Sequence, residues 1–192
     1  MKVIGITGGV GSGKSLVVNT LKEMLDAKVL IADDIGKELS SPGGALEDRI
    51  IAEFGTIDRG ELANIIFKDR EKKKCLEDII HPAVIGYITD VIEENKEREG
   101  FILLESAILF ESKTDALCDE IWYIFVNKEK RIERLMKDRG YTREKCEAII
   151  EAQKPDEYYK EKCDQTIDNS YDKIHLQEEL KKVVSLINSK NL

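Results

Sequence analysis

Eight consecutive residues near the N-terminus have the types and spacing of a phosphate-binding loop. Residues 8–15 read Gly-Gly-Val-Gly-Ser-Gly-Lys-Ser, in which two glycines flank four free positions and are followed by lysine and serine. Glycines let successive backbone N–H groups turn inward around an anion, and the lysine places a cation against the β- and γ-phosphates. We therefore expect a nucleoside triphosphate to contact Gly9, Gly11, Ser12, Gly13, Lys14, Ser15 and Leu16, with the Ser15 hydroxyl also a ligand of Mg²⁺.

The flanking residues predict the strand–loop–helix order that this motif requires. Val3–Ile6 is a short apolar run, typical of a buried strand, and apolar side chains recur at helical spacing from Leu16 to Leu25. The alternative is a glycine-rich turn that matches the pattern by chance, and these flanks make it a remote one. A helix N-terminus beneath the loop would add its partial positive charge to the phosphate site.

The composition indicates a soluble globular protein and disfavours several classes of partner. The 192 residues are 42% hydrophobic and 35% charged, with a formal net charge of −8. An acidic protein is expected to lack a nucleic-acid surface, and no apolar run approaches the ~20 residues of a membrane span. Four scattered cysteines predict neither a zinc site nor disulfides. We expect a cytoplasmic protein without a signal peptide, a nucleic-acid partner or a membrane partner; the oligomeric state stays open, with a monomer slightly favoured.

Short apolar runs alternate with helical patterns along the chain. Beyond the first strand, strand character recurs in four ranges: 28–32, 101–104, 121–126 and 166–168. Continuous apolar runs suit the strands of a parallel sheet that helices cover on both faces. The alternation predicts an α/β protein with a parallel sheet, the three-layer P-loop NTPase fold.

Two segments are interpreted as insertions into one domain of residues 1–192. The helical block at about residues 35–95 is too long for a simple crossover and is expected to form a lobe. Within it, a helix is expected to begin at Pro82, and Phe67 is expected on an apolar helix face together with Leu62. The charge-rich stretch at about residues 131–162 is expected to be a mobile lid.

Other residues separate the classes of nucleotide-binding protein. Asn127–Lys130 follows an apolar strand where a guanine-reading Asn-Lys-x-Asp would lie, but lysine replaces the aspartate. Asp33–Gly36 matches a switch-type Asp-x-x-Gly, a pattern that arises easily by chance. A GTPase is therefore disfavoured. A small-molecule kinase needs a carboxylate for the acceptor hydroxyl, cations for the transferred phosphate and a lid that excludes water.

Asp33 is the first choice for the general base, because it follows the strand expected beside the phosphate loop. Ligands bind at the carboxyl edge of such sheets. The alternative role of Asp33 is a helix N-cap, which Asp34 fills at least as well. Among the arginines near the lid, Arg139 is the best candidate for a phosphate clamp, whereas a solvated helix face is favoured for Arg131. His81, taken by itself, is interpreted as structural.

Taken together, these residues resemble the dephospho-coenzyme A kinase family. The likeness runs through most of the chain, and these segments carry it in order: Gly5–Ser15, Ala32–Asp33, Pro42–Gly44, Phe54–Gly55, Ile80–Pro82, Leu109–Glu111, Arg134–Leu135 with Arg139, Gln153, and Ile167–Asn169. The resemblance implies transfer of the γ-phosphate of ATP, with Mg²⁺, to the ribose 3′-hydroxyl of dephospho-coenzyme A.

The resemblance also implies roles for individual residues. Asp33 would act on the acceptor hydroxyl, His81 would line the acceptor pocket in the helical lobe, and Arg139 would reach the ATP phosphates. Further contacts are implied with the adenine for Asn169 and with the acceptor for Glu105 and Phe110. Glu105 also resembles the acid that holds Mg²⁺ through water in many such folds.

The chain departs from the family pattern at a few positions. Ile31 stands where the family commonly has an aspartate. Glu105 and Ala107 stand where it has aspartate and proline. Ile149 replaces an arginine late in the lid helix, which leaves open how many arginines hold the phosphates.

Two rival hypotheses remain at this point. A nucleoside or nucleoside-monophosphate kinase would use a nucleotide as acceptor and would not turn over dephospho-coenzyme A. A regulatory nucleotide-binding module would bind its nucleotide tightly, hydrolyse it slowly and phosphorylate no acceptor.

Overall fold

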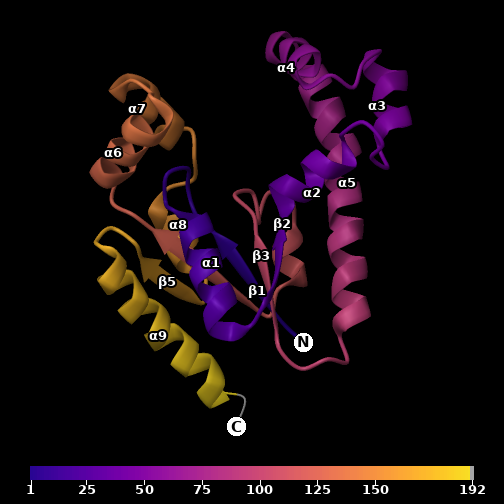
Figure 1. Ribbon diagram of the computed structural model, residues 1–192. Coiled ribbons are helices and arrows are strands. Elements are labelled where there is room, and N and C mark those ends of the chain that lie inside the picture. Colours follow the sequence, from indigo (N-terminus) through magenta and orange to yellow (C-terminus); the bar gives the residue numbers. More distant parts are fainter. Residues whose placement is uncertain (191–192) are drawn as a thin grey trace. The chain divides into compact units, whose positions relative to one another are not determined.

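The computed structural model describes residues 1–190 (Figure 1). In this part of the chain, five strands form one sheet in the order β2-β3-β1-β4-β5. Their bounds are β1 Lys2–Thr7, β2 Lys28–Ile31, β3 Phe101–Glu105, β4 Glu120–Phe125 and β5 Gln165–Asp168. Strand β1 pairs in parallel with β3 and β4, and β4 pairs in parallel with β5. The prediction of an α/β fold with a parallel sheet is confirmed. The expectation that the strand before Asp33 lies beside the strand before the phosphate loop is wrong, because β3 lies between β2 and β1.

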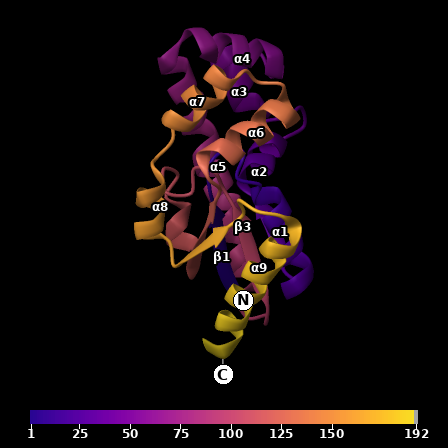
Figure 2. The ribbon, with the colours of Figure 1, turned by 90° about the vertical axis from the view of Figure 1, so that its left-hand side faces the viewer.

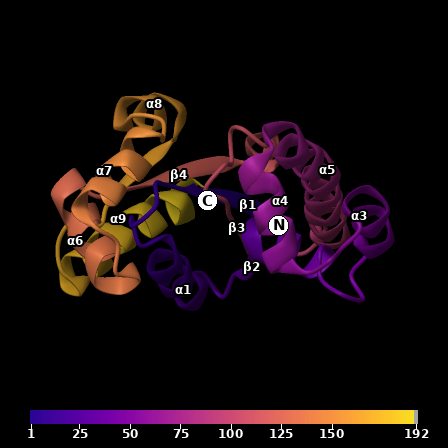
Figure 3. The same ribbon diagram turned by 90° about the horizontal axis from the view of Figure 1, so that it is seen from above.

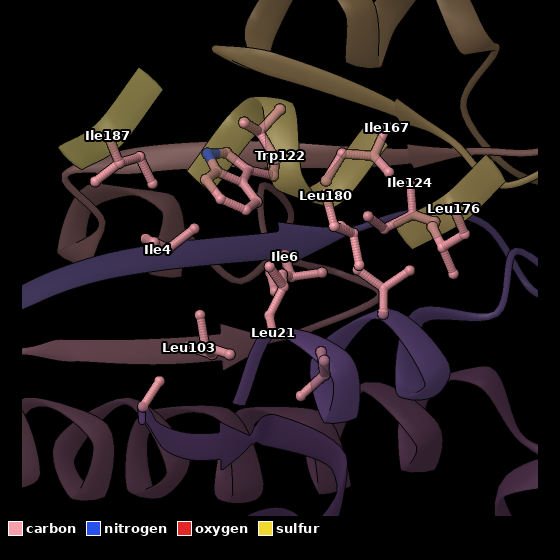
Figure 4. Close-up of a cluster of buried hydrophobic side chains, with 14 residues drawn as sticks. Ile4, Ile6, Leu21, Leu103, Trp122, Ile124, Ile167, Leu176, Leu180 and Ile187 are labelled. Carbon is pink, nitrogen blue, oxygen red and sulfur yellow. The ribbon is translucent and has the colours of Figure 1, made fainter. Parts of the chain in front are cut away.

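One face of the sheet packs against two helices that lie far apart in the sequence. Helices α1 (Lys14–Leu25) and α9 (Lys173–Lys190) lie side by side on this face (Figure 2). Figure 4 shows Ile4, Ile6 and Trp122 of the sheet against Leu21 of α1 and Leu180 of α9, all fully buried. This apolar cluster fixes the end of β1 and the start of α1, the two elements that flank the glycine-rich loop.

On the opposite face of the sheet, α8 (Asp156–Lys162) packs against β4. Side chains alternate along β4, so Trp122 points to α1 and α9 whereas Tyr123 points the other way. The Tyr123 ring stacks on Tyr159 of α8, with ring centroids 4.8 Å apart. Figure 3 shows α8 and α1 on opposite sides of the strands, which gives the three layers expected from the sequence.

The chain divides into two compact units. The first contains Met1–Val29 and the chain from Arg98 onward, and the second contains Leu30–Glu97. The second unit is helical, with α2 Ala32–Leu39, α3 Glu47–Phe54, α4 Arg59–Lys68 and α5 Arg70–Asn95. Ile50, Leu62 and Ile79 form the centre of its own apolar cluster. The assignment of about residues 35–95 as an acceptor lobe within a single domain stays a prediction.

The helices of the second unit differ from the expectations in two respects. Helix α5 runs unbroken through Pro82, so the predicted helix start there is wrong. Apolar positions on both sides of Pro82, among them Ile79 and Val84, are buried, and their packing offsets the hydrogen bond that proline cannot make. Phe67 is 91% exposed, because it lies five positions beyond buried Leu62 and falls off that face of α4.

The second predicted strand ends one residue earlier than expected, at Ile31. Helix α2 begins at Ala32, and its N-cap position is Ile31. Asp33 and Asp34 therefore lie within the first helical turn, and the prediction that Asp34 caps this helix is wrong. Two carboxylates in the first turn still interact favourably with the positive end of the helix dipole, which is why this start needs no side-chain cap.

The charge-rich segment of the first unit forms three short helices, α6 (Lys128–Arg139), α7 (Arg143–Glu151) and α8. The predicted cap of α6 is confirmed: Asn127 Oδ1 accepts a hydrogen bond of 2.9 Å from the Lys130 N–H. Gly140 ends the helix with a φ of 63°. The assignment of about residues 131–162 as a mobile lid stays a prediction. Among the described residues, no helix has the length and apolar character needed to cross a membrane.

All four cysteines of the chain are free. Burial raises the pKa of the Cys118 thiol to about 12, with Asp115 and Asp119 adding to the shift. Burial likewise raises the pKa of Cys163 to about 12, assisted by Asp164. Both thiols are therefore protonated at neutral pH.

Two glycines of the helical unit provide a matched test of its backbone. A Cβ would meet nothing within 4 Å at Gly86 or at Gly55, but only Gly55 has a positive φ, of +75°. Because Gly86 lies inside α5, Gly86→Ala should raise the free energy of unfolding by about 0.5–1 kcal/mol. Gly55→Ala should lower it by about 1 kcal/mol, since alanine is strained in the left-handed region. Urea denaturation measures the free energy of unfolding of both variants. Equal effects would contradict the backbone conformations of Gly55 and Gly86 described above.

Candidate functional site

The glycine-rich loop connects the buried end of β1 to the first residue of α1 (Figure 1). Gly11 and Gly13 have φ angles of 81° and 78°, which other residues adopt only with strain. At Gly13, a Cβ would also lie 2.6 Å from Asn169 Nδ2. Both the backbone conformation and the close approach of Asn169 therefore require glycine at this position.

Lys14 is the first residue of α1, and its side chain folds back over the loop. Its Nζ donates hydrogen bonds to the carbonyl oxygens of Gly8, at 2.9 Å, and Gly9, at 3.5 Å. Ser15 and Leu16 follow it and are exposed in the first turn of α1. This turn reads Lys-Ser-Leu-Val, so no carboxylate competes for the positive end of the helix dipole. The arrangement of cation, helix end and loop suits a polyphosphate.

The loop is tied to the end of β5 by Asn169. Its side-chain Nδ2 donates a buried hydrogen bond of 2.8 Å to the Ser12 carbonyl. The Asn169 carbonyl in turn accepts a bond of 2.8 Å from Arg134 Nη2. Asn169 thus supports the loop itself, a contact that sequence reasoning did not anticipate. Its proposed contact with adenine stays a prediction.

Three buried polar atoms near the loop have no hydrogen-bond partner among the described residues. They are Thr7 Oγ1, Ser12 Oγ and Arg134 Nη1. Thr7 ends β1 and Ser12 lies in the loop, while Arg134 reaches the loop from α6. Buried polar groups are normally satisfied, so unsatisfied groups beside a phosphate loop are consistent with a site prepared for a polar ligand.

Arg131 is the residue that sequence reasoning placed wrongly. It is not on a solvated face, because only 7% of its surface is exposed. Its Nε donates to the Val10 carbonyl at 3.0 Å, and its Nη2 donates to Gln153 Oε1. The signal in the sequence was its position four residues before the buried Leu135, which puts both side chains on one face of α6.

Glu105 and Phe110 belong to the same unit as the loop. Glu105 ends β3 and lies opposite Ile6 in the parallel register with β1, so its carboxylate lies at the strand end that leads into the loop. Phe110 is half-buried in a cluster of rings, with its centroid 5.7 Å from Tyr158 and 6.3 Å from Tyr159. The carboxyl edge of a parallel sheet is where ligands bind in such folds.

Arg139 is the last residue of α6 and is exposed. Arg131 and Arg134 of the same helix instead contact the loop region, at Val10 and Asn169. The structure thus brings two arginines to the loop that the sequence analysis ranked below Arg139. A clamp role for Arg139 stays a prediction.

Asp33 and His81 lie in the helical unit. Asp33 is exposed in the first turn of α2, two residues after the end of β2. Its neighbour Asp34 forms an exposed ion pair of 2.6 Å with Lys37. His81 is half-buried in α5, next to Pro82. The proposed roles of both residues towards the acceptor stay predictions.

The donor set at the loop fits Mg²⁺ bound together with phosphates. The described residues contain no group of three or more histidine, cysteine or acidic side chains that could hold a metal ion by themselves. Mg²⁺ usually binds through one or two protein oxygens, with waters and substrate phosphates completing its shell. The exposed Ser15 hydroxyl and the Glu105 carboxylate are oxygen donors of this kind.

Comparisons with known proteins agree on one family. The family model described as "Dephospho-CoA kinase" matches residues 2–174. A dephospho-CoA kinase of Carboxydothermus hydrogenoformans is 37% identical over 179 residues, which are 88% of this chain and 86% of that protein.

Solved structures give the same result. The structure of a dephospho-CoA kinase from Campylobacter jejuni superposes with a TM-score of 0.75 at 26% identity, with 100% of both chains covered. A shikimate kinase from Acinetobacter baumannii shares the fold, with a TM-score of 0.59 at 17% identity over 100% of this chain and 96% of that one. With its phosphate loop and its parallel sheet, the chain belongs to the dephospho-CoA kinase family.

Proposed function

We propose that this chain transfers the γ-phosphate of ATP to the ribose 3′-hydroxyl of dephospho-coenzyme A. The observation that carries the proposal is the loop at residues 8–15, with Lys14 folded across it, in a chain of this family. Phosphoryl transfer needs little covalent chemistry from the protein and depends on positioning and on charge stabilisation. The fixed loop, the cation and the end of α1 supply both.

The roles of the remaining site residues combine the chemistry of the transfer with what the resemblance to the family implies. Asp33 is the general base that accepts the proton of the acceptor hydroxyl, and its exposed carboxylate is accessible to a substrate. Lys14 and Arg139 stabilise the charge of the transferred phosphate. His81 and Phe110 line the acceptor site, and Asn169 borders the adenine of ATP.

Ser15 is the proposed protein ligand of Mg²⁺, and Glu105 is a second oxygen donor for it. When bound, the ion neutralises charge on the β- and γ-phosphate oxygens. Ser15 is exposed at the positive end of α1, immediately after Lys14. A cytoplasmic location and a monomeric state remain further parts of the proposal.

The first experiment measures ADP release from Mg-ATP with dephospho-coenzyme A as the acceptor. We expect ADP release that depends on this acceptor, because the chain has a phosphate loop and belongs to the dephospho-CoA kinase family. Parallel reactions contain adenosine, AMP or buffer alone. Release with a nucleotide acceptor would assign another small-molecule kinase, and slow release that needs no acceptor would assign a regulatory nucleotide-binding module.

Asp33→Asn tests the general base. The change removes the proton acceptor but keeps size and polarity, so kcat should fall by at least about 100-fold. The affinity for ATP should change by less than about twofold, since the loop and Lys14 are untouched. Asp34→Asn is the matched control, because Asp34 lies in the same exposed turn and forms only a surface ion pair with Lys37. Equal kcat values for the two variants would remove Asp33 from the role.

Lys14→Ala tests whether the loop is the working site. Loss of the cation over the loop should weaken ATP binding and lower kcat together, the latter by about 100-fold or more. Lys22→Ala, near the other end of α1 and exposed, serves as the control and should keep wild-type kinetics. Turnover that is unchanged in the Lys14 variant would mean that phosphate transfer occurs elsewhere.

A further inference from the structure

Both backbone groups of Val10 are held by side chains from outside the loop. The Val10 N–H donates to Gln153 Oε1 at 3.2 Å, and the Val10 carbonyl accepts from Arg131 Nε at 3.0 Å. Arg131 Nη2 also donates to Gln153 Oε1, which closes the set of contacts. A single residue in the middle of the phosphate loop is therefore held at both its N–H and its carbonyl, so the two peptide groups that flank its Cα are both fixed.

The two side chains come from different elements. Arg131 lies in the first half of α6, whereas Gln153 follows the end of α7 by two residues. Val10 is separated from them by 121 and 143 positions in the sequence. The contact set thus joins α6, the segment after α7 and the phosphate loop, three separate segments of one unit.

Arg131 is a buried cation whose hydrogen-bond acceptors are neutral oxygens. Among the described residues it forms no ion pair with a carboxylate. Burial lowers the pKa of Arg131, while the nearby Tyr123, Asp156 and Tyr159 oppose that shift. The hydroxyl of Tyr123 donates to Asp156 Oδ1 at 2.6 Å, so this carboxylate is already engaged. The positive charge of Arg131 therefore lies against the phosphate loop without an ion-paired carboxylate, as suits a site for a polyanion.

Gly9 is the loop residue that Arg131 constrains. A Cβ at Gly9 would lie 2.6 Å from Arg131 Cζ and 2.7 Å from Gln153 Oε1, and it would clash still more closely with Arg131 Nη2. The φ of Gly9 is outside the left-handed region, so its backbone conformation alone would accept alanine. A side chain at position 9 would therefore displace the guanidinium group of Arg131 from its contacts with Val10 and Gln153.

We propose that Arg131 is a positioning residue of the phosphate loop, which acts with Gln153 to fix the N–H and the carbonyl of Val10. While it does so, its guanidinium group leaves room only for glycine at position 9. The proposal rests on the proposed function only in that the loop binds ATP. It differs from a role as a space-filling side chain, which would need only the aliphatic stem of Arg131. It also differs from a role as a point charge, which lysine would fill equally well.

A double-mutant cycle on Gly9 and Arg131 tests the proposal. Methionine keeps the stem of Arg131 and ends near the position of Nε, so Arg131→Met removes the atoms that would clash with a residue at position 9. We measure the Kd of Mg-ATP by calorimetry, without acceptor, for Gly9→Ala, Arg131→Met and the double variant. Gly9→Ala should weaken binding about tenfold in the natural background and less than about twofold in the Arg131→Met background.

Arg131→Lys separates positioning from charge. Lysine lacks the planar fork that bonds Val10 through Nε and Gln153 through Nη2, so the Kd of ATP should rise about tenfold for lysine and for methionine alike. In the full reaction, the KM for ATP should rise while the KM for dephospho-coenzyme A stays within about twofold. Lys137→Met removes an exposed cation of α6 and Gly86→Ala adds a methyl group in open space; both controls should bind ATP as the natural protein does.

Three results would overturn the inference. The first is an equal effect of Gly9→Ala in both backgrounds. The second is wild-type affinity for ATP in Arg131→Lys, and the third is a lower melting temperature of Arg131→Met without any change in Kd. If the methionine variants do not fold, Gln153→Leu removes the acceptor of the Val10 N–H, and an unchanged Kd in that variant contradicts the proposal. Tight ATP binding without turnover of dephospho-coenzyme A would contradict the proposed function alone.

Discussion

The phosphate loop works only if its backbone is held still, because a flexible chain of glycines would lose conformational entropy each time a nucleotide binds. Strand β1 provides one fixed end: it lies inside the sheet, between β3 and β4, and its Ile4 and Ile6 are fully buried. Helix α1 provides the other end, through Val17 and Leu21 in the same apolar cluster. The rest of the first unit is arranged around these two anchors.

The middle of the loop needs anchors of its own, and polar side chains provide them. Asn169 holds the Ser12 carbonyl from the end of β5, and Arg131 with Gln153 holds Val10 from the helices that follow β4. All of these bonds involve backbone groups of the loop rather than its side chains. Substitutions in the loop and in its distant supports are therefore expected to be energetically coupled, as residues in one hydrogen-bond network are.

The features that the sequence predicted well are local ones. The loop, the strand before it and the helix after it follow from spacing alone, and so does the Asn127 cap of α6. The position of Arg131 four residues before Leu135 indicates the buried face of α6, but its contact with Val10, 121 residues away, leaves no local pattern. The unbroken helix through Pro82 was missed for a similar reason, because packing on both sides of the proline outweighs its local preference. The spacing of residue types does not reveal contacts between residues that lie far apart in the sequence.

The protonated state of two cysteines has a consequence for the chemistry of the proposed acceptor. Dephospho-coenzyme A and its product both end in a thiol, and their oxidised forms exchange with protein thiolates to give mixed disulfides. The nucleophile in this exchange is the thiolate, whose fraction at neutral pH is negligible for Cys118 and Cys163, with pKa values of about 12. At these two positions the fold thus protects the protein from covalent capture by its own substrate.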